Sequence, residues 1–329
     1  MPKEITKPTP LLKADGSTTV GWASSNLLDY NKIDCTASST RIKEWDRYTV
    51  VSPECAVTLS IADLGNLGYV FASLTDFTKK PCRTFSQTIT KAYPMGRMSL
   101  PLSPKSGDAT YTSKQVGMRF SRSANSRFLN CEYVNFCEGK TLYLNLSLDE
   151  PDHWAIASAT DFGDKKGLFA YRYQVSRMPA SGVIRYGGAE YQFRPDSSFG
   201  TLSWCRGVFP SKTCFNTATL FGQADESPFV LFAGDSLQSA LYYGGRFYKL
   251  DEISVSSEKD GSWKLRFPQA DSRLEMSVLG KNEVRSSFLM NFCQYRQAFG
   301  SFSGKISVNG ITVPLKHISG FTEQFESRL

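Results

Sequence analysis

Three two-residue turns constrain this chain most, because each one joins two segments whose side chains alternate between apolar and polar. Gly and Asn tolerate the positive φ angles that such turns need, and the turns twist in the sense that antiparallel strands require. The turns are Gly187-Gly188, between residues 183–186 and 189–193; Gly244-Gly245, between 240–243 and 246–250; and Asn309-Gly310, between 305–308 and 311–313. The sequence therefore predicts three β-hairpins.

Alternation with period two recurs along the rest of the chain, where it predicts further strands. These are expected at 47–51, 57–61, 69–73, 117–121, 129–134, 141–148, 169–175, 263–267 and 299–308, and only 22–30 and 76–85 have patterns typical of short helices. Because 15 Tyr and 23 Phe also favour sheet over helix, we expect an all-β protein of two packed antiparallel β-barrels or sandwiches with few short helices.

The length of 329 residues favours two domains. The break at Pro179-Ala180-Ser181-Gly182 places the predicted boundary near residue 178. We therefore expect an N-terminal β-domain over 1–178 and a C-terminal β-domain over 179–329.

Charge and hydropathy exclude several classes of function. The net charge is +7, but the 38 Lys and Arg residues are scattered, whereas a nucleic-acid-binding protein concentrates them in a patch. The N-terminus lacks the apolar core of a signal peptide, and apolar runs such as 229–233 are far too short to cross a membrane. We expect a soluble, cytoplasmic protein with no nucleic-acid partner and no integral membrane segment.

The sequence offers little to a metal or a cofactor. It has two histidines, His153 and His317, and eight cysteines without a C-x-x-C pair, so we expect no metal site and reduced cysteines that pack as small apolar side chains. No Gly-rich nucleotide loop is present, and we expect no cofactor. Gly234-Asp235-Ser236-Leu237 matches a hydrolase motif by letters, but Pro314 stands where the partner aspartate of His317 is needed. We interpret that match as a coincidence.

Residues 41–48 hold the first candidate site. As a strand, this segment places Glu44 and Asp46 on one face, about 7 Å apart, and Arg41 and Trp45 on the other. Two such carboxylates can divide the roles of acid and base if burial raises the pKa of one. The alternative is a solvated face of mixed charge, whose ion pairs contribute little.

Trp204-Cys205-Arg206-Gly207 is the second candidate site. Trp204 and Arg206 share one strand face, where an indole beside a guanidinium can bind a ligand that carries a carboxylate, carbonyl or phosphate. Asp196, with Arg194, is a candidate partner of Arg206. The alternative is that Trp204 closes a barrel and Arg206 donates to loop carbonyls.

Several short motifs occur in a fixed order along the chain. They include Arg41-Ile42-Lys43-Glu44-Trp45-Asp46, Tyr93-Pro94-Met95-Gly96, Met178-Pro179-Ala180-Ser181-Gly182, Trp204-x-Arg206-Gly207 and Phe299-Gly300-x-Phe302-Ser303-Gly304. In this order the motifs resemble the family called domain of unknown function 2804, over about residues 4 to 325. That family is distantly similar to the tandem lipocalin-like proteins, a group that includes tocopherol cyclase and hydroxyneurosporene synthase.

The resemblance implies two lipocalin-like (calycin-type) barrels, each able to hold an apolar ligand. Enzymes of the wider group cyclise, hydrate or isomerise terpenoid-like substrates by proton transfer, without a redox cofactor. The resemblance places Trp204 and Arg206 on the family's Trp-Gly-Arg-Gly, and Glu44, Trp45 and Asp46 on its Lys-Glu-Trp-Asp. This chain departs from the family at Ser203, which replaces an Asp, and at Cys205, which replaces a Gly.

Three functions follow as hypotheses. The first is a protein that binds an apolar or amphipathic small molecule (a lipid or a terpenoid-like compound) in a barrel, with Arg41, Trp45, Asp196, Trp204 and Arg206 in contact with it. The second is a cofactor-independent lyase, isomerase or cyclase, in which Glu44 or Asp46 supplies the proton. The third is a non-catalytic interaction scaffold with filled barrels.

Overall fold

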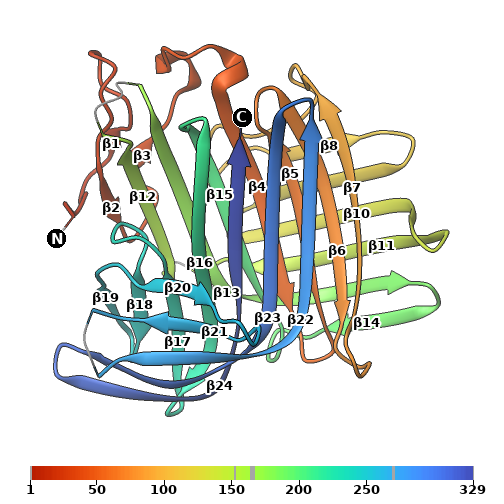
Figure 1. The fold of residues 1–329 in the computed structure, drawn as a ribbon, viewed down its shortest axis with the longest axis vertical. Helices are drawn as coiled ribbons and strands as arrows, with labels where there is room; N and C mark the ends of the chain where they lie inside the picture. Colours follow the sequence, from red (N-terminus) through yellow and green to blue (C-terminus); the bar gives the residue numbers. More distant parts are fainter. Residues whose placement is uncertain (1, 152, 164–166, 269–270, 329) are drawn as a thin grey trace.

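The computed structural model describes residues 2–151, 153–163, 167–268 and 271–328, and strands make up most of them. They form two curled antiparallel half-barrel sheets that pack against each other (Figure 1). The all-β expectation and the packed barrel-like architecture are confirmed.

The first sheet has 13 strands within the described residues, in the order β7-β6-β5-β4-β15-β13-β11-β10-β9-β8. β12 pairs with β13 and with β2, and β14 pairs with the second half of β13. The strands are β2 Gly21–Ala23, β4 Ile42–Val51, β5 Cys55–Asp63, β6 Leu67–Asp76, β7 Arg83–Ala92, β8 Ala109–Thr112, β9 Val116–Ser123, β10 Ser126–Cys137, β11 Lys140–Asp149, β12 Ala155–Asp161, β13 Phe169–Tyr186, β14 Ala189–Phe193 and β15 Phe199–Val208.

The second sheet has nine strands in the described part of the chain, in the order β19-β18-β17-β16-β24-β23-β22-β21-β20. They are β16 Lys212–Ala224, β17 Ser227–Ala233, β18 Ala240–Tyr243, β19 Arg246–Lys249, β20 Ser254–Ser257, β21 Trp263–Arg266, β22 Arg273–Phe288, β23 Asn291–Val308 and β24 Ile311–Arg328. A short parallel pair, β1 Thr9–Pro10 and β3 Leu28–Asp29, and two 3-10 helices, η1 Lys32–Asp34 and η2 Ser39–Arg41, complete the described elements.

All three predicted hairpins are present. Gly187 and Gly188 turn between β13 and β14 with φ of 57° and 84°, and Gly244 and Gly245 turn between β18 and β19 with φ of 57° and 72°. Asn309 and Gly310 join β23 to β24 with φ of 48° and 78°. Positive φ at both central residues is what the right-handed twist of the flanking strands demands.

Both predicted helices are wrong. Residues 22–30 contain the end of β2 and all of β3, and residues 76–85 cross from the end of β6 to the start of β7. Each segment has aromatic and apolar residues at spacings that suit a helix, but pairing with neighbouring strands decides its conformation. Trp22, for example, pairs in register with Ser158 of β12.

The boundary expected at residue 178 falls inside β13. Strands β14 and β15 follow it and still belong to the first sheet. Sheet membership changes between Val208, where β15 ends, and Lys212, where β16 begins.

The outer face of the first sheet is covered by the second sheet where β4, β5 and β6 lie. Nearly every residue of these three strands is buried, whereas β9 and β10 alternate between buried and exposed residues. A strand buried on both faces has no solvated side, so its burial pattern shows no alternation. Each half-barrel has its own apolar core, and two further apolar clusters fill the space between the sheets.

Polar side chains also connect the two sheets. Gln297 of β23 donates to Thr49 and accepts from Thr58, at 3.1 and 2.7 Å. Arg47 of β4 lies 3.2 Å from Glu323 of β24, with its guanidinium 3.9 Å from the centre of the Tyr295 ring. These contacts fix how one sheet lies on the other, because buried polar groups need their partners.

No helix among the described residues is long and apolar enough to cross a membrane. The eight cysteines are free thiols, four of them buried.

Candidate functional site

A cavity of about 490 Å³ opens where β4 begins and β5 ends. Its walls come from η1 and η2, the turn after β5, and the long connection between β7 and β8. The lining residues are Lys32, Ser39, Thr40, Ile42, Glu44, Asp63, Gly65, Tyr93, Met95, Gly96, Met98, Ser99 and Leu100. Apolar and charged side chains therefore share one cavity, as they do in sites for amphipathic ligands.

Two carboxylates face each other across neighbouring strands in this cavity. Glu44 on β4 and Asp63 on β5 are direct partners in the antiparallel register, so their side chains lie on the same face of the sheet. Lys32 from η1 reaches over the cavity and places its Nζ atom 2.5 Å from Glu44 Oε2. Glu44 is buried, so its negative charge has to be balanced by such partners.

The environment separates the two carboxylates chemically. Burial raises the pKa of Asp63, and the nearby charge of Glu44 adds to this rise, while a hydrogen bond from the Gly65 N–H at 2.8 Å and the positive charge of Lys32 oppose it. Glu44 has the ammonium of Lys32 in direct contact. Neighbouring carboxyl groups in unlike environments are the usual basis for an acid and a base in one site.

Arg206 of β15 lies behind Glu44 with its side chain fully buried. Its Nη2 atom donates to Asp46 Oδ1 at 2.7 Å and to the Pro101 carbonyl at 2.7 Å, and its Nη1 atom donates to the carbonyls of Trp45 and Cys205. The Nε atom lies 3.3 Å from the Pro101 carbonyl and 3.5 Å from Glu44 Oε1. All three guanidinium nitrogens therefore already have protein partners.

Asp46 is enclosed with Arg206 and does not line the cavity. Burial raises the pKa of the Asp46 carboxyl, and the positive charge of Arg206 works against that rise. Trp204 lies under the same guanidinium, 4.2 Å from the ring centre to Arg206 Cζ, and is also outside the cavity lining. Of the residues expected from the sequence, Glu44, Asp46, Trp204 and Arg206 thus form one cluster, and Glu44 alone lines the cavity.

The other three expected contact residues lie elsewhere. Trp45 points away from the first core and stacks on Phe209 and Phe325, between the two sheets. Arg41 is exposed at the end of η2, beside Thr40 of the cavity wall. Asp196 is exposed in the turn before β15. The extended strand from Phe199 to Arg206 separates this turn from the guanidinium-bearing residue, so the distance between Asp196 and Arg206 is more than about 20 Å.

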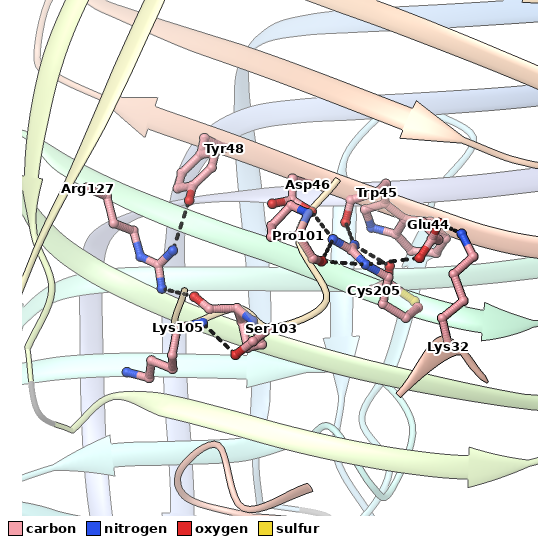
Figure 2. A network of polar contacts seen from close by, with 12 residues as sticks. Lys32, Glu44, Trp45, Asp46, Tyr48, Pro101, Ser103, Lys105, Arg127 and Cys205 are labelled. Carbon is pink, nitrogen blue, oxygen red and sulfur yellow. Dashed lines mark hydrogen bonds and ion pairs between the residues drawn. The ribbon is translucent and has the colours of Figure 1, made fainter. Parts of the chain in front are cut away.

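The connection between β7 and β8 is held over this cluster by arginines. Arg206, Arg127 and Arg122 donate to the carbonyls of Pro101, Pro104 and Lys105, at 2.7, 2.7 and 2.9 Å. Figure 2 shows Pro101 next to Asp46, with Arg127 reaching Tyr48 further along the same network. Glu150 balances the charge of this second group, since Lys105, Arg122 and Arg127 all pair with it.

Sequence reasoning missed Asp63 and Lys32, and also Tyr30, whose pKa is raised by burial and by the nearby charge of Glu44. Tyr30 is buried, and its hydroxyl has no hydrogen-bond partner among the described residues. Lys32 and Tyr30 come from an irregular segment, whose path no periodicity predicts. Asp63 could be found only from the register of β4 with β5, in which it lies opposite Glu44.

Three solved structures illustrate what this chain is similar to. A candidate AttH protein from Nitrosomonas europaea is similar at 12% identity and a TM-score of 0.49, over 86% of this chain and 92% of that one. Kievitone hydratase from Nectria haematococca is similar at 12% identity and a TM-score of 0.45, over 91% and 92%. CghA, crystallised with Sch210972, is similar at 9% identity and a TM-score of 0.43, over 88% and 89%.

No curated protein matches the sequence. A family model described as "Domain of unknown function (DUF2804)" matches residues 2–329.

Proposed function

The chain belongs to the DUF2804 family, and we propose that it binds an amphipathic small molecule with an uncharged, hydroxyl-bearing polar end in the cavity above Glu44. The observation that carries this proposal is the pair of facing carboxyl groups, Glu44 and Asp63, in a cavity of about 490 Å³. This volume lies within the range of sites that hold small organic ligands.

The apolar part of the ligand has a matching wall. Ile42, Met98 and Leu100 line the cavity beside the charged groups, and Met98 is flexible enough to fit ligands of different shapes. A lipid or terpenoid-like skeleton would bury its hydrocarbon against these three side chains. This burial stabilises the complex by about 25 cal/mol for each Å² of apolar surface removed from water.

The charges at the other end select the polar group. Among the described residues that line the cavity, Lys32 is the one cation and is already paired with Glu44, while Asp63 adds a second carboxyl group. A ligand carboxylate would approach two carboxyl groups, whereas a ligand hydroxyl can donate to them. An alcohol is therefore favoured over the corresponding acid.

Binding of two matched fluorescent probes, pyrenebutanol and pyrenebutanoic acid, tests this proposal. We expect the alcohol to bind at least tenfold more tightly than the acid, and Glu44→Gln to weaken alcohol binding severalfold. Glu132→Gln, at an exposed position of β10, is the matched control and should leave binding unchanged. Tighter binding of the acid, or equal loss in both variants, would contradict the proposal.

The same two carboxyl groups support a second candidate function, proton transfer to a bound unsaturated alcohol. Asp63, whose pKa is raised by burial, would donate a proton to the substrate, and Glu44 as the carboxylate would accept one from it, so that protons balance without a redox cofactor. Asp46 enters this scheme only as a positioning residue, because it acts through Arg206.

Isotope exchange separates the two functions. With geraniol as the substrate in deuterium oxide, proton transfer predicts incorporation of deuterium at carbon, detected by mass spectrometry. Asp63→Asn should abolish this incorporation while pyrenebutanol still binds. If the probe binds and no deuterium is incorporated, the protein binds its ligand without transferring protons, and the hypothesis of an enzyme is contradicted.

A further inference from the structure

One edge of the molecule gathers its most exposed apolar side chains. Among the described residues, the four large apolar side chains with the greatest exposure are Ile33, Met95, Leu289 and Met290, at 81 to 89%, and the next is Leu279 at 55%. Ile33 lies in η1, Met95 in the connection after β7, and Leu289 and Met290 form the turn between β22 and β23. Exposed apolar side chains that gather on one part of a surface are typical of interaction sites.

Strand register brings these loops to the same edge, which is at the top in Figure 1. The first residues of β4 pair with the last of β15, and Leu67 at the start of β6 pairs with Ala92 at the end of β7. On the second sheet, Arg328 pairs with Phe292, next to the β22–β23 turn. A hydrogen bond of 3.1 Å between Thr90 and Ser286 joins β7 to β22 just below both loops. We call this the loop edge, defined by residues 29–42, 63–67, 91–98, 208–212, 285–291 and 328.

Cationic side chains lie on the same loop edge. Arg41, Arg97, Lys212, Arg285 and Arg328 are exposed on the loop edge, while Asp34 and Asp29 are its exposed carboxylates among the described residues. The cavity above Glu44 also opens here, since Met95 lines its wall. Apolar side chains that share a surface with cations are typical of proteins that lie on anionic membranes, because the negative headgroups attract Lys and Arg.

We propose that the loop edge docks on the surface of an anionic lipid bilayer, with these four apolar side chains inserted among the headgroups. A protein partner would need a surface complementary to four separate tips, whereas a bilayer adapts to them. The arrangement also directs the cavity mouth toward the bilayer, although docking itself does not depend on what the cavity binds.

Flotation of the full chain with ligand-free vesicles tests this proposal. We expect the protein to float with vesicles of phosphatidylcholine and phosphatidylserine in a 7:3 ratio, and to stay at the bottom with phosphatidylcholine alone. Replacing Ile33, Met95, Leu289 and Met290 together by Ser should reduce the bound fraction at least tenfold. These side chains are almost fully exposed, so the variant should keep its circular dichroism spectrum and its Tm.

The control is the double variant Leu279→Ser and Ile311→Ser, which removes exposed apolar side chains away from the loop edge and should bind within twofold of the wild type. Wild-type protein that fails to float with anionic vesicles would overturn the proposal, as would equal loss in both variants. A dimer in sedimentation velocity that only the Ser variant of the loop edge abolishes would assign this surface to a second copy of the chain instead. The pyrenebutanol experiment stays separate, because it needs no vesicles.

Discussion

At the scale of single residues, Arg206, Lys32, Glu44 and Asp46 form one charge-balanced group in the first half-barrel. Arg206 donates to Asp46, to backbone carbonyls and toward Glu44, while Lys32 holds the outer oxygen of Glu44. The attraction within a buried pair only offsets the cost of removing its charges from water. Removing one member of the pair therefore lowers the free energy of unfolding by much more than the intact pair adds to it.

Replacement of Arg206 tests this arrangement. We expect Arg206→Met to lower the free energy of unfolding by about 3 to 5 kcal/mol, because Asp46 would keep a buried charge without its partner. Urea denaturation followed by circular dichroism measures the change. Arg185→Ala, which breaks an exposed pair with Glu190, is the control and should leave the urea midpoint almost unchanged. Equal effects would show that the Arg206 cluster is solvated.

Lys43 gives a prediction for pH. Its Nζ atom is buried without a hydrogen-bond partner among the described residues, and burial lowers the pKa of Lys43 to about 8. An unfolded lysine has a pKa of about 10.4, so between these values the unfolded chain binds a proton that the folded chain lacks, and stability rises with pH. Lys43→Met should therefore be more stable than the wild type at pH 7, by about 3 kcal/mol, and lose this advantage toward pH 10.5. Urea midpoints at pH 7, 8, 9 and 10 measure it, and a difference that stays constant would contradict the prediction.

At the scale of elements, alternation in the sequence predicted many of the strands, because a period of two survives wherever one sheet face is solvated. It also assigned Glu44 and Asp46 to the face opposite Trp45, which is the arrangement in β4. Alternation alone could not show that the second sheet covers the outer face of β4. It also could not find the Asp63 carboxylate opposite Glu44, because cross-strand register depends on the lengths and paths of turns.

Close packing of strands explains the glycine of the Trp-x-Arg-Gly motif. A Cβ atom on Gly207 of β15 would lie 2.4 Å from the carbonyl oxygen of Phe169 in β13. We expect Gly207→Ala to destabilise the fold by about 2 kcal/mol or more, since backbone atoms cannot move aside. Gly117 of β9 has open space around it and an ordinary φ, so Gly117→Ala should be neutral or slightly stabilising. Thermal unfolding compares the two variants, and similar Tm values would contradict the close approach of the β15 and β13 backbones at Gly207.

At the scale of the whole molecule, the two half-barrels share an interface that is both apolar and polar. Gln297 lies in its middle and bonds to Thr49, Thr58 and Asn282, and Asn282 in turn donates to Ser73. Such an interface ties the stability of each sheet to the other, so a single unfolding transition is expected, with coincident curves from circular dichroism and tryptophan fluorescence.

Truncation of Gln297 tests this coupling. Gln297→Ala leaves buried hydroxyl and amide groups of both sheets without partners and should cost about 3 kcal/mol. Gln192→Ala, on exposed β14, should change stability by less than about 0.5 kcal/mol. If the Gln297 variant unfolds in two separate steps, the interface network is what makes the two half-barrels one cooperative unit. A loss no larger than that of the control would contradict its role.

The arginines that hold the connection between β7 and β8 have a consequence for how this protein changes over evolution. They bind the carbonyl oxygens of residues 101, 104 and 105, and every amino acid has such an oxygen. Substitutions along the connection can therefore accumulate while its path is retained, whereas Arg122, Arg127 and Arg206 cannot be exchanged so freely. Outside the shared Tyr93-Pro94-Met95-Gly96 motif, related chains should therefore vary along residues 97–105, which include the cavity-lining Met98, Ser99 and Leu100, and new ligand preferences can arise there without rebuilding the barrel.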